Sequence, residues 1–217
     1  MSDIFQEVDE EVRREQFQKL WERYQGLIIG AAVLIVLAVG GWRLYDWWET
    51  KKAAEAGAAF EAAITLSQAG KHAEAEAAFS KIAEETTTTY RTLALLRAAA
   101  ELAQTDPKAA VAAYDKIAGN SSIVADMRDL AALRAGALLI DSGTFADTRQ
   151  RLEPMAGADH TFRHTARELL ALGAWRAGDT ASAKRWIEAI DGDAATPPDE
   201  RSRIEMLGAL MASEGKS

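Results

Sequence analysis

The chain has 217 residues, 48% of them hydrophobic, and its 33 acidic and 25 basic side chains give a net charge of −8 at pH 7. That length suits a membrane anchor plus one domain of ordinary size, or two small domains. The excess of acid argues against a nucleic-acid partner, because neutralising phosphates needs a basic face. The chain contains no cysteine, which excludes disulfides, thiolate nucleophiles and cysteine-ligated metals.

The first segment, residues 1–23, is predicted to be an acidic amphipathic helix. Apolar side chains recur in it at spacings of three and four and form two successive stripes, Phe5, Val8 and Val12, then Phe17, Leu20 and Tyr24. We expect this head to be cytoplasmic and to lie along the membrane surface or against a partner. Its negative charge disfavours tight adhesion to anionic lipid.

Residues 24–42, YQGLIIGAAVLIVLAVGGW, contain no charged side chain. As a helix they would span roughly 28 Å, close to the hydrocarbon thickness of a bilayer. Four of the six tryptophans border the segment, where their amphipathic rings favour the headgroup layer. They are Trp21, Trp42, Trp47 and Trp48. The sequence therefore predicts a transmembrane anchor rather than the core helix of a soluble protein.

A cleaved export signal is the main alternative for this segment. Such signals combine a short basic head, an apolar run of about 7–15 residues and a small-residue cleavage site. Ala38–Gly40 could serve as that site, but the head here is long and acidic and the apolar run is longer. We therefore expect the anchor to be retained.

Basic residues near the anchor favour one orientation. Four lie before it and three after it, which favours a cytoplasmic N-terminus and places the rest of the chain outside the cytoplasm. Residues 43–52 are predicted to be a helical connector at the membrane. Because no proline occurs between Arg43 and Ala69, the membrane helix can continue directly into the next helix.

Gly26 and Gly30 form a GxxxG pair inside the anchor, and Trp42 closes its far end. Small residues at this spacing let a second helix approach closely, so lateral association with a membrane partner is one interpretation. The other is that glycine is simply common in membrane helices.

Residues 53–217 are predicted to form a domain of repeated helix pairs. Four segments align, with starts spaced 35, 38 and 35 residues apart. Each has a small residue five positions after its start and larger apolar residues nine and twelve positions after it, as close antiparallel packing requires. The starts are Gly70, Thr105, Gly143 and Gly178, and the small residues are Ala75, Ala110, Thr148 and Ala183.

Each aligned segment follows another alanine- and leucine-rich stretch that ends in a Gly, Asp or Pro turn, as helices do. A helix–turn–helix unit of about 34 residues is typical of a tetratricopeptide-like α-solenoid. A last helix, with Thr196 as its expected cap, would close the array. The predicted fold is all-α: one transmembrane helix, then about four helix pairs and a C-terminal capping helix.

Candidates for catalysis are few. His160 and His164 are spaced as i and i+4 and could hold a metal if residue 160 is helical, but no glutamate follows His160 as in the zinc-protease pattern. Surface or capping roles for both histidines are the favoured alternative. No motif for a serine nucleophile, a phosphate loop or a dinucleotide is present. We predict a protein that is not an enzyme and has no cofactor.

Stacked helix pairs offer a concave surface that accepts peptides or partner helices. Arg97, in LLRAA, and Arg134, in ALRAG, recur on two successive first helices. They could bind a carboxylate or an acidic peptide. The alternative is that both arginines simply face solvent.

Along nearly its whole length the chain resembles the ancillary Sec translocon subunit family of Gram-negative bacteria. The resemblance rests on GGWRLYDWW at 40–48, AWRAGDTASAKRWIEAI at 174–190 and IEMLGALM at 204–211. It implies a single-span inner-membrane protein with a cytoplasmic N-terminus and a periplasmic tetratricopeptide-like domain. The head is longer and more acidic than the family pattern.

The resemblance also implies partners: the translocon, a membrane-anchored periplasmic folding factor and newly exported polypeptides. The expected role is that of a non-catalytic, chaperone-like adapter. Two other functions stay open at this point. One is a scaffold for another envelope complex, in division or respiration, and the other is a metal-dependent protein using His160 and His164.

Overall fold

The computed structural model describes residues 3–86 and 89–214. Within them it contains nine α-helices and one short 3-10 helix, which confirms the predicted all-α class. The chain divides into two compact units, residues 1–55 and 56–217. The side chains of residues 1–20 and 22, on which the amphipathic face of the head was predicted, lie outside the described residues.

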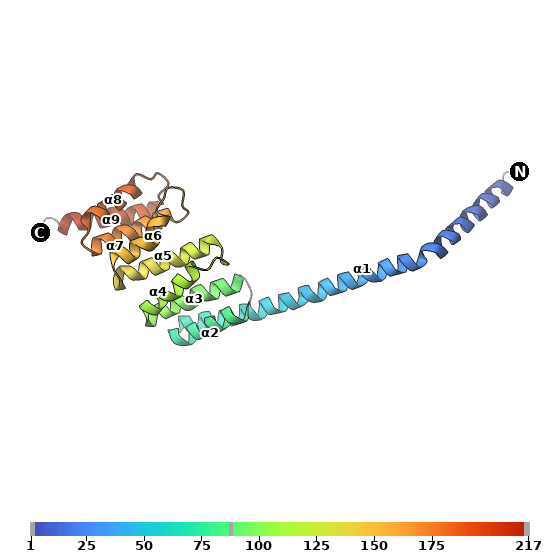
Figure 1. Cartoon of the computed structure of the whole chain (residues 1–217), viewed down its shortest axis with the longest axis horizontal. Coiled ribbons are helices and arrows are strands. Elements are labelled where there is room, and N and C mark those ends of the chain that lie inside the picture. Colours follow the sequence, from blue (N-terminus) through green and yellow to red (C-terminus); the bar gives the residue numbers. More distant parts are fainter. Residues whose placement is uncertain (1–2, 87–88, 215–217) are drawn as a thin grey trace. The chain divides into compact units, whose positions relative to one another are not determined.

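Helix α1 (Asp3–Gln68) runs without interruption through the head, the apolar segment and the connector, and ends as the first helix of the repeat domain (Figure 1). The predicted continuation of the membrane helix is therefore confirmed. No proline interrupts the hydrogen-bond ladder of α1, and its glycines weaken a helix without ending it.

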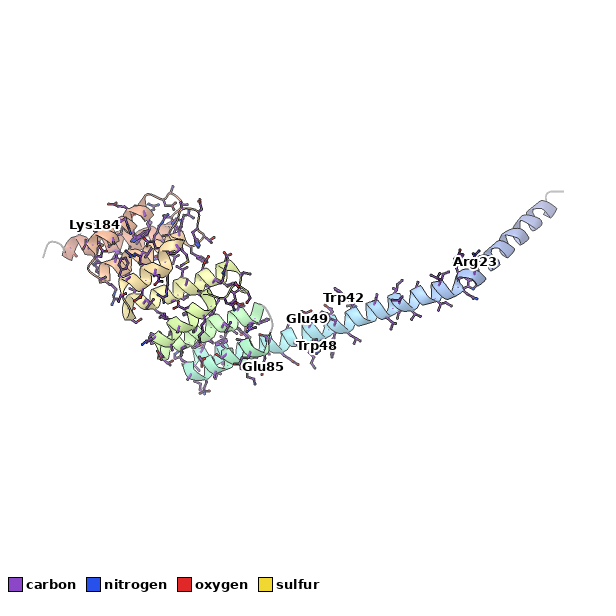
Figure 2. The ribbon with its side chains drawn as sticks, viewed as in Figure 1. Arg23, Trp42, Trp48, Glu49, Glu85 and Lys184 are labelled. Carbon is purple, nitrogen blue, oxygen red and sulfur yellow. The ribbon has the colours of Figure 1, made fainter. Side chains whose placement is uncertain are left out.

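Every side chain of residues 24–42 is exposed, including Trp42 at 73%. Figure 2 shows Trp42 and Trp48 projecting from α1. Among the described residues, α1 contains the one stretch long and apolar enough to cross a membrane, and none of it is buried within the protein. The core helix of a soluble domain would be buried. The ammonium group of Lys52 lies 3.6 Å from the ring centre of Trp48, a pairing suited to the headgroup layer.

The helix pairs of the repeat domain follow one another in chain order, and α9 packs against both α7 and α8 (Figure 1). Four pairs are closed by a last helix, and each second helix also packs on the first helix of the next pair. The pairs are the end of α1 with α2 (His72–Glu85), α3 (Thr89–Thr105) with α4 (Pro107–Ala118), α5 (Ala125–Ser142) with α6 (Phe145–Leu152), and α7 (Arg163–Arg176) with α8 (Thr180–Asp191). The closing helix is α9 (Pro198–Glu214).

Glycine ends the first helix of the first and last pairs. Gly70 and Gly178 have φ angles of 73° and 76°, which an L side chain would strain. The next amide then bonds five residues back, from Lys71 to the Leu66 carbonyl at 3.0 Å in the first pair. Asp106 begins the second helix of the second pair by accepting the amide of Ala109 at 2.9 Å.

The core consists of small residues at helix crossings and larger residues beside them. The four small repeat positions (Ala75, Ala110, Thr148 and Ala183) are all 0% exposed. Around Thr148 the approach is close: a methyl group added to Gly173 of α7 would lie 3.5 Å from the Thr148 methyl. Leu152 of α6 fills the space above Gly136 of α5 and is itself fully buried.

Two local expectations differ from the structure. The second helix of the third pair ends at Leu152, and a 3-10 turn η1 (Glu153–Met155) follows, because Pro154 has no amide to donate to a further α-helical turn. Thr196 does not cap the last helix. Its buried hydroxyl donates instead to the Ile190 carbonyl of α8 at 2.8 Å, and α9 begins at Pro198.

Asp193 ties the loop after α8 to α7. Its Oδ2 lies 2.8 Å from Arg163 Nε and 3.0 Å from Arg167 Nη1. The bond from the Arg163 guanidinium is the main reason that the pKa of Asp193 lies well below its usual range. Arg167 is nearly buried and also donates to the Ala156 carbonyl, so the same cluster holds the loop after α6.

Candidate protein-binding surface

The first helices of the pairs form one continuous wall of the repeat domain. Helix α5 contacts both α3 and α7, and α7 contacts α9, while the second helices pack on first helices. In stacks of helix pairs this arrangement leaves the first helices on the concave side, where peptides bind.

Accessible residues form a stripe on each of three first helices. Within each stripe successive residues are four, three and four positions apart, so they lie on a single helical face. All members of the stripes are exposed or half-buried, and we call the three stripes together the inner wall. They are Leu93, Arg97, Ala100 and Gln104 on α3; Leu130, Arg134, Ala137 and Asp141 on α5; and Thr165, Leu169, Leu172 and Arg176 on α7.

Arg97 and Arg134 hold the same place in the stripes of α3 and α5, 37 residues apart, and both side chains are exposed. Among the described residues, no ion pair or hydrogen bond engages either guanidinium. The Arg176 guanidinium, on the same wall, is paired with Asp141 at 2.7 Å.

The carboxylates near Arg97 and Arg134 already have partners. Glu101, four residues after Arg97, accepts the Ser67 hydroxyl at 2.6 Å and contacts His72 Nδ1 at 2.8 Å. Asp115 of α4 binds the guanidinium of Arg151 at 2.7 and 2.9 Å. These carboxylates therefore neutralise other groups, and the positive charges of Arg97 and Arg134 on the inner wall stay unpaired within the part of the chain that the structure describes.

Tyr114 of α4 connects the two arginines electrostatically. Its ring is buried with residues of α3 and α5, and this burial raises the pKa of the hydroxyl. The charges of Arg134 and Arg97 act against that rise in pKa. Both guanidinium groups therefore lie within electrostatic reach of one hydroxyl.

A second concave feature lies between α2 and α4, with α3 as its floor. This groove of about 470 Å³ is lined mainly by apolar side chains, among them Leu95 and Leu102, with Glu76 and Lys116 at its polar positions. Much of the lining is alanine, so the groove presents a smooth apolar surface with few groups that could fix a ligand's orientation.

The metal interpretation of His160 and His164 depended on residue 160 being helical, and it is not. His160 lies in the loop before α7, where its Nε2 is 3.3 Å from Asp129 Oδ2. His164 is on α7, with Nδ1 3.2 Å from the Thr196 hydroxyl. Among the described residues, no three histidine, aspartate or glutamate side chains gather as a metal site. Both histidines instead link loops to helices.

Gly26 and Gly30 lie on the exposed part of α1. A methyl group added to either would meet no other atom within 4 Å. The surface around this pair is thus open to another helix, which leaves the lateral-association hypothesis a proposal.

Arg97 and Arg134 were predicted from the sequence as candidates for peptide binding, whereas Leu93, Leu130 and Tyr114 were not. A signal for the leucines was present, because Leu93 and Leu130 are separated by the same 37 residues as the two arginines. Tyr114 carried only a packing signal, as the large residue of its repeat.

This fold and this surface define a class of protein: an all-α repeat protein built to bind other proteins. The model of the tetratricopeptide repeat-like domain family matches residues 18–194, and the chain belongs to that family. The match begins within α1, ahead of the apolar segment, and ends just after α8. Comparisons with curated proteins and with solved structures found no match. Domains of this type are usually non-catalytic modules with protein partners.

Proposed function

We propose that this chain is a membrane-anchored adapter that binds proteins at the Sec translocon and assists the export or periplasmic folding of newly translocated polypeptides. One observation carries the proposal: an exposed apolar segment long enough to span a bilayer continues, within a single helix, into a tetratricopeptide-like domain with an open inner wall. Binding without chemistry suffices for this role.

The proposed orientation has the N-terminus in the cytoplasm and the repeat domain in the periplasm of a bacterial inner-membrane protein. The larger number of basic residues before the anchor supports it. The place beside the translocon, with a membrane-anchored folding factor, is supported by the resemblance at 40–48, 174–190 and 204–211. The exposed Gly26–Gly30 pair supports contact with a partner helix in the bilayer.

Topology is tested with single cysteines, because the chain has none of its own. Ser2→Cys and Ser213→Cys variants in spheroplasts are treated with a thiol reagent that does not cross membranes. We expect full-length protein in the membrane fraction and labelling at position 213 alone. Labelling at position 2 alone would place the repeat domain in the cytoplasm and overturn an export-side role.

Partners are tested by replacing Ala137, on the inner wall, with a photoreactive residue in living cells. We expect crosslinks to translocon subunits, to the folding factor or to exported chains. The matched control is the same residue at Ala112, exposed on α4 and part of the groove beside α2. Absence of translocon components from both samples would overturn the proposal, and enrichment of division or respiratory components would favour a scaffold there.

The membrane contact is tested with Gly30→Leu, which fills the open surface of α1. We expect the variant to stay in the membrane but to lose co-purification of its membrane partner. Unchanged co-purification would show that the glycine pair has no part in the contact.

A further inference from the structure

We infer that the inner wall binds an extended acidic segment of a partner protein, with one carboxylate at Arg97 and a second at Arg134. This rests on the proposed function, in which the wall is a protein-binding surface, and it names the chemistry of the segment that the wall accepts.

The charges of Arg97 and Arg134 are not neutralised by any residue that the structure describes. In a chain of net charge −8, most arginines of the repeat domain are engaged by carboxylates or backbone carbonyls. The engaged ones are Arg149, Arg151, Arg163, Arg167, Arg176, Arg185, Arg201 and Arg203. Arg97, Arg134, Arg91 and Arg128 have no such partner among the described residues, and of these four only Arg97 and Arg134 lie on the inner wall. Within that described part of the chain they stay unpaired although Glu101 and Asp141 lie on the same helices. Unpaired guanidinium groups are strong ligands for carboxylates.

The spacing of the two arginines suits an extended peptide. Packed helices lie about 8–10 Å apart, so Arg97 and Arg134, at matching places on α3 and α5, are one such step from each other. An extended chain advances about 3.1–3.4 Å per residue. Three residues therefore cover one step. A polyproline II segment also returns its side chains to the same side every third residue. The wall thus fits acidic residues spaced i and i+3.

The surface beside the two arginines is apolar. Leu93 and Leu130 lie one helical turn before the arginines, and Ala100 and Ala137 lie about one turn after them. The leucines offer apolar contact to side chains between the acids, and the alanines let a partner backbone approach closely. A Glu-Pro-Leu-Glu segment would satisfy both the spacing and the apolar contact.

Two arginines in successive repeats also favour a peptide with two acidic side chains over a peptide bound by its C-terminal carboxylate. A C-terminal carboxylate supplies a single charge, which one guanidinium can bind in bidentate fashion. Two guanidinium groups separated by a helix step are better matched by two carboxylates.

The test uses the full-length protein in detergent micelles and a rhodamine-labelled peptide, Gly-Ser-Glu-Pro-Leu-Glu-Ser-Gly, with an amidated C-terminus. Fluorescence anisotropy gives Kd. We expect Arg97→Gln and Arg134→Gln each to weaken binding by about tenfold, the loss of roughly one charge-assisted hydrogen bond. The peptide with Gln in place of both Glu should lose binding.

The control variant is Arg91→Gln, which removes the same charge from the same helix. Arg91 is exposed but lies outside the stripe of α3, so we expect Kd to be unchanged. Thermal unfolding of each variant should match that of the parent protein, because all three side chains are exposed.

Three outcomes would overturn the inference. The first is equal weakening by Arg91→Gln, which would show general charge attraction. The second is equal binding of a peptide with neutral side chains and a free C-terminus, which would make a terminal carboxylate the ligand. The third is no binding of the acidic peptide. In the third case the crosslinks from Ala137 would still decide the proposed function independently.

Discussion

The apolar segment of α1 and the first helices of the repeat domain are both rich in apolar residues, but the size of those residues and their burial differ. In residues 24–42 the large residues are exposed, as Leu34 is at 69%. In α3 and α5 the buried residues are mainly alanines, such as Ala94 and Ala131. Buried alanines let helices pack closely against one another, whereas exposed large aliphatic side chains suit lipid.

Exposed large residues and buried alanines both occur within α1. Its side chains are exposed from Arg23 to Glu55, and then Ala56 and Ala63 are buried, Ala63 in a core cluster with residues of α2 and α3. Helical structure therefore does not determine burial. The distribution of residue size along the helix does.

The largest effect on the repeat domain should come from Leu152→Ala. Leu152 is fully buried beside Gly136, and its loss leaves a cavity. We expect the free energy of unfolding to fall by about 2–5 kcal/mol. Urea unfolding measures this, with Leu210→Ala as control, since Leu210 is 48% exposed. Similar losses in the two variants would contradict the packing described for α6.

A charge introduced into the apolar segment should weaken its membrane insertion and leave the stability of the repeat domain unchanged. An arginine at the centre of a membrane helix costs about 2.5–3.5 kcal/mol of insertion free energy. We expect Leu34→Arg to lower the membrane-bound fraction without changing the Tm of the repeat domain. Leu210→Arg, made in the exposed face of α9, should remain membrane-bound. If Leu34→Arg lowered Tm instead, the segment would belong to a soluble core.

Two glycines, Gly136 in the repeat domain and Gly30 in the apolar segment, differ in the space around them. A methyl group at Gly136 would lie 2.6 Å from Leu152 Cδ2, while one at Gly30 would meet nothing within 4 Å. We expect Gly136→Ala to destabilise the repeat domain by about 1–3 kcal/mol, because Leu152 must move. Gly30→Ala should leave unfolding unchanged. Equal effects in urea unfolding would mean that α5 and α6 are not in close contact.

The smallest expected effect is on acid stability. Because the folded pKa of Asp193 is lowered, its contribution is complete above the unfolded pKa of about 3.9 and is lost as pH falls below it. Arg163, Arg167 and His164 face this carboxylate. Asp193→Asn should therefore lower Tm at pH 7 and reduce the difference in Tm between pH 7 and pH 3. Asp126→Asn, at an exposed site, should change neither.

Periodic features of the structure were predictable from sequence. The repeat spacing located the helix pairs because each pair reuses one packing geometry, with a small residue such as Ala75 or Ala183 at the crossing. The continuity of α1 followed from the absence of proline. These are local signals, carried by residues within a few turns of one another.

Polar partnerships were not predictable, because they join residues far apart in sequence. Glu101 binds Ser67 and His72, although Arg97 is closer in sequence as a possible partner. That Arg97 and Arg134 have equivalent places followed from the repeat. That neighbouring carboxylates leave them unpaired depended on the folded arrangement.

The unbroken course of α1 also has a consequence for the first helix pair. A helix that begins leaves its first amide groups without carbonyl partners, and α2 to α9 each begin within the repeat domain. The first helix of the first pair has no such beginning, because it is the end of α1. The amides from Ala56 onward bond to carbonyls of the preceding turn of α1, residues 52–55. The anchor helix thus supplies the N-terminal cap of the first repeat, and a fragment beginning at Ala56 would need a new one.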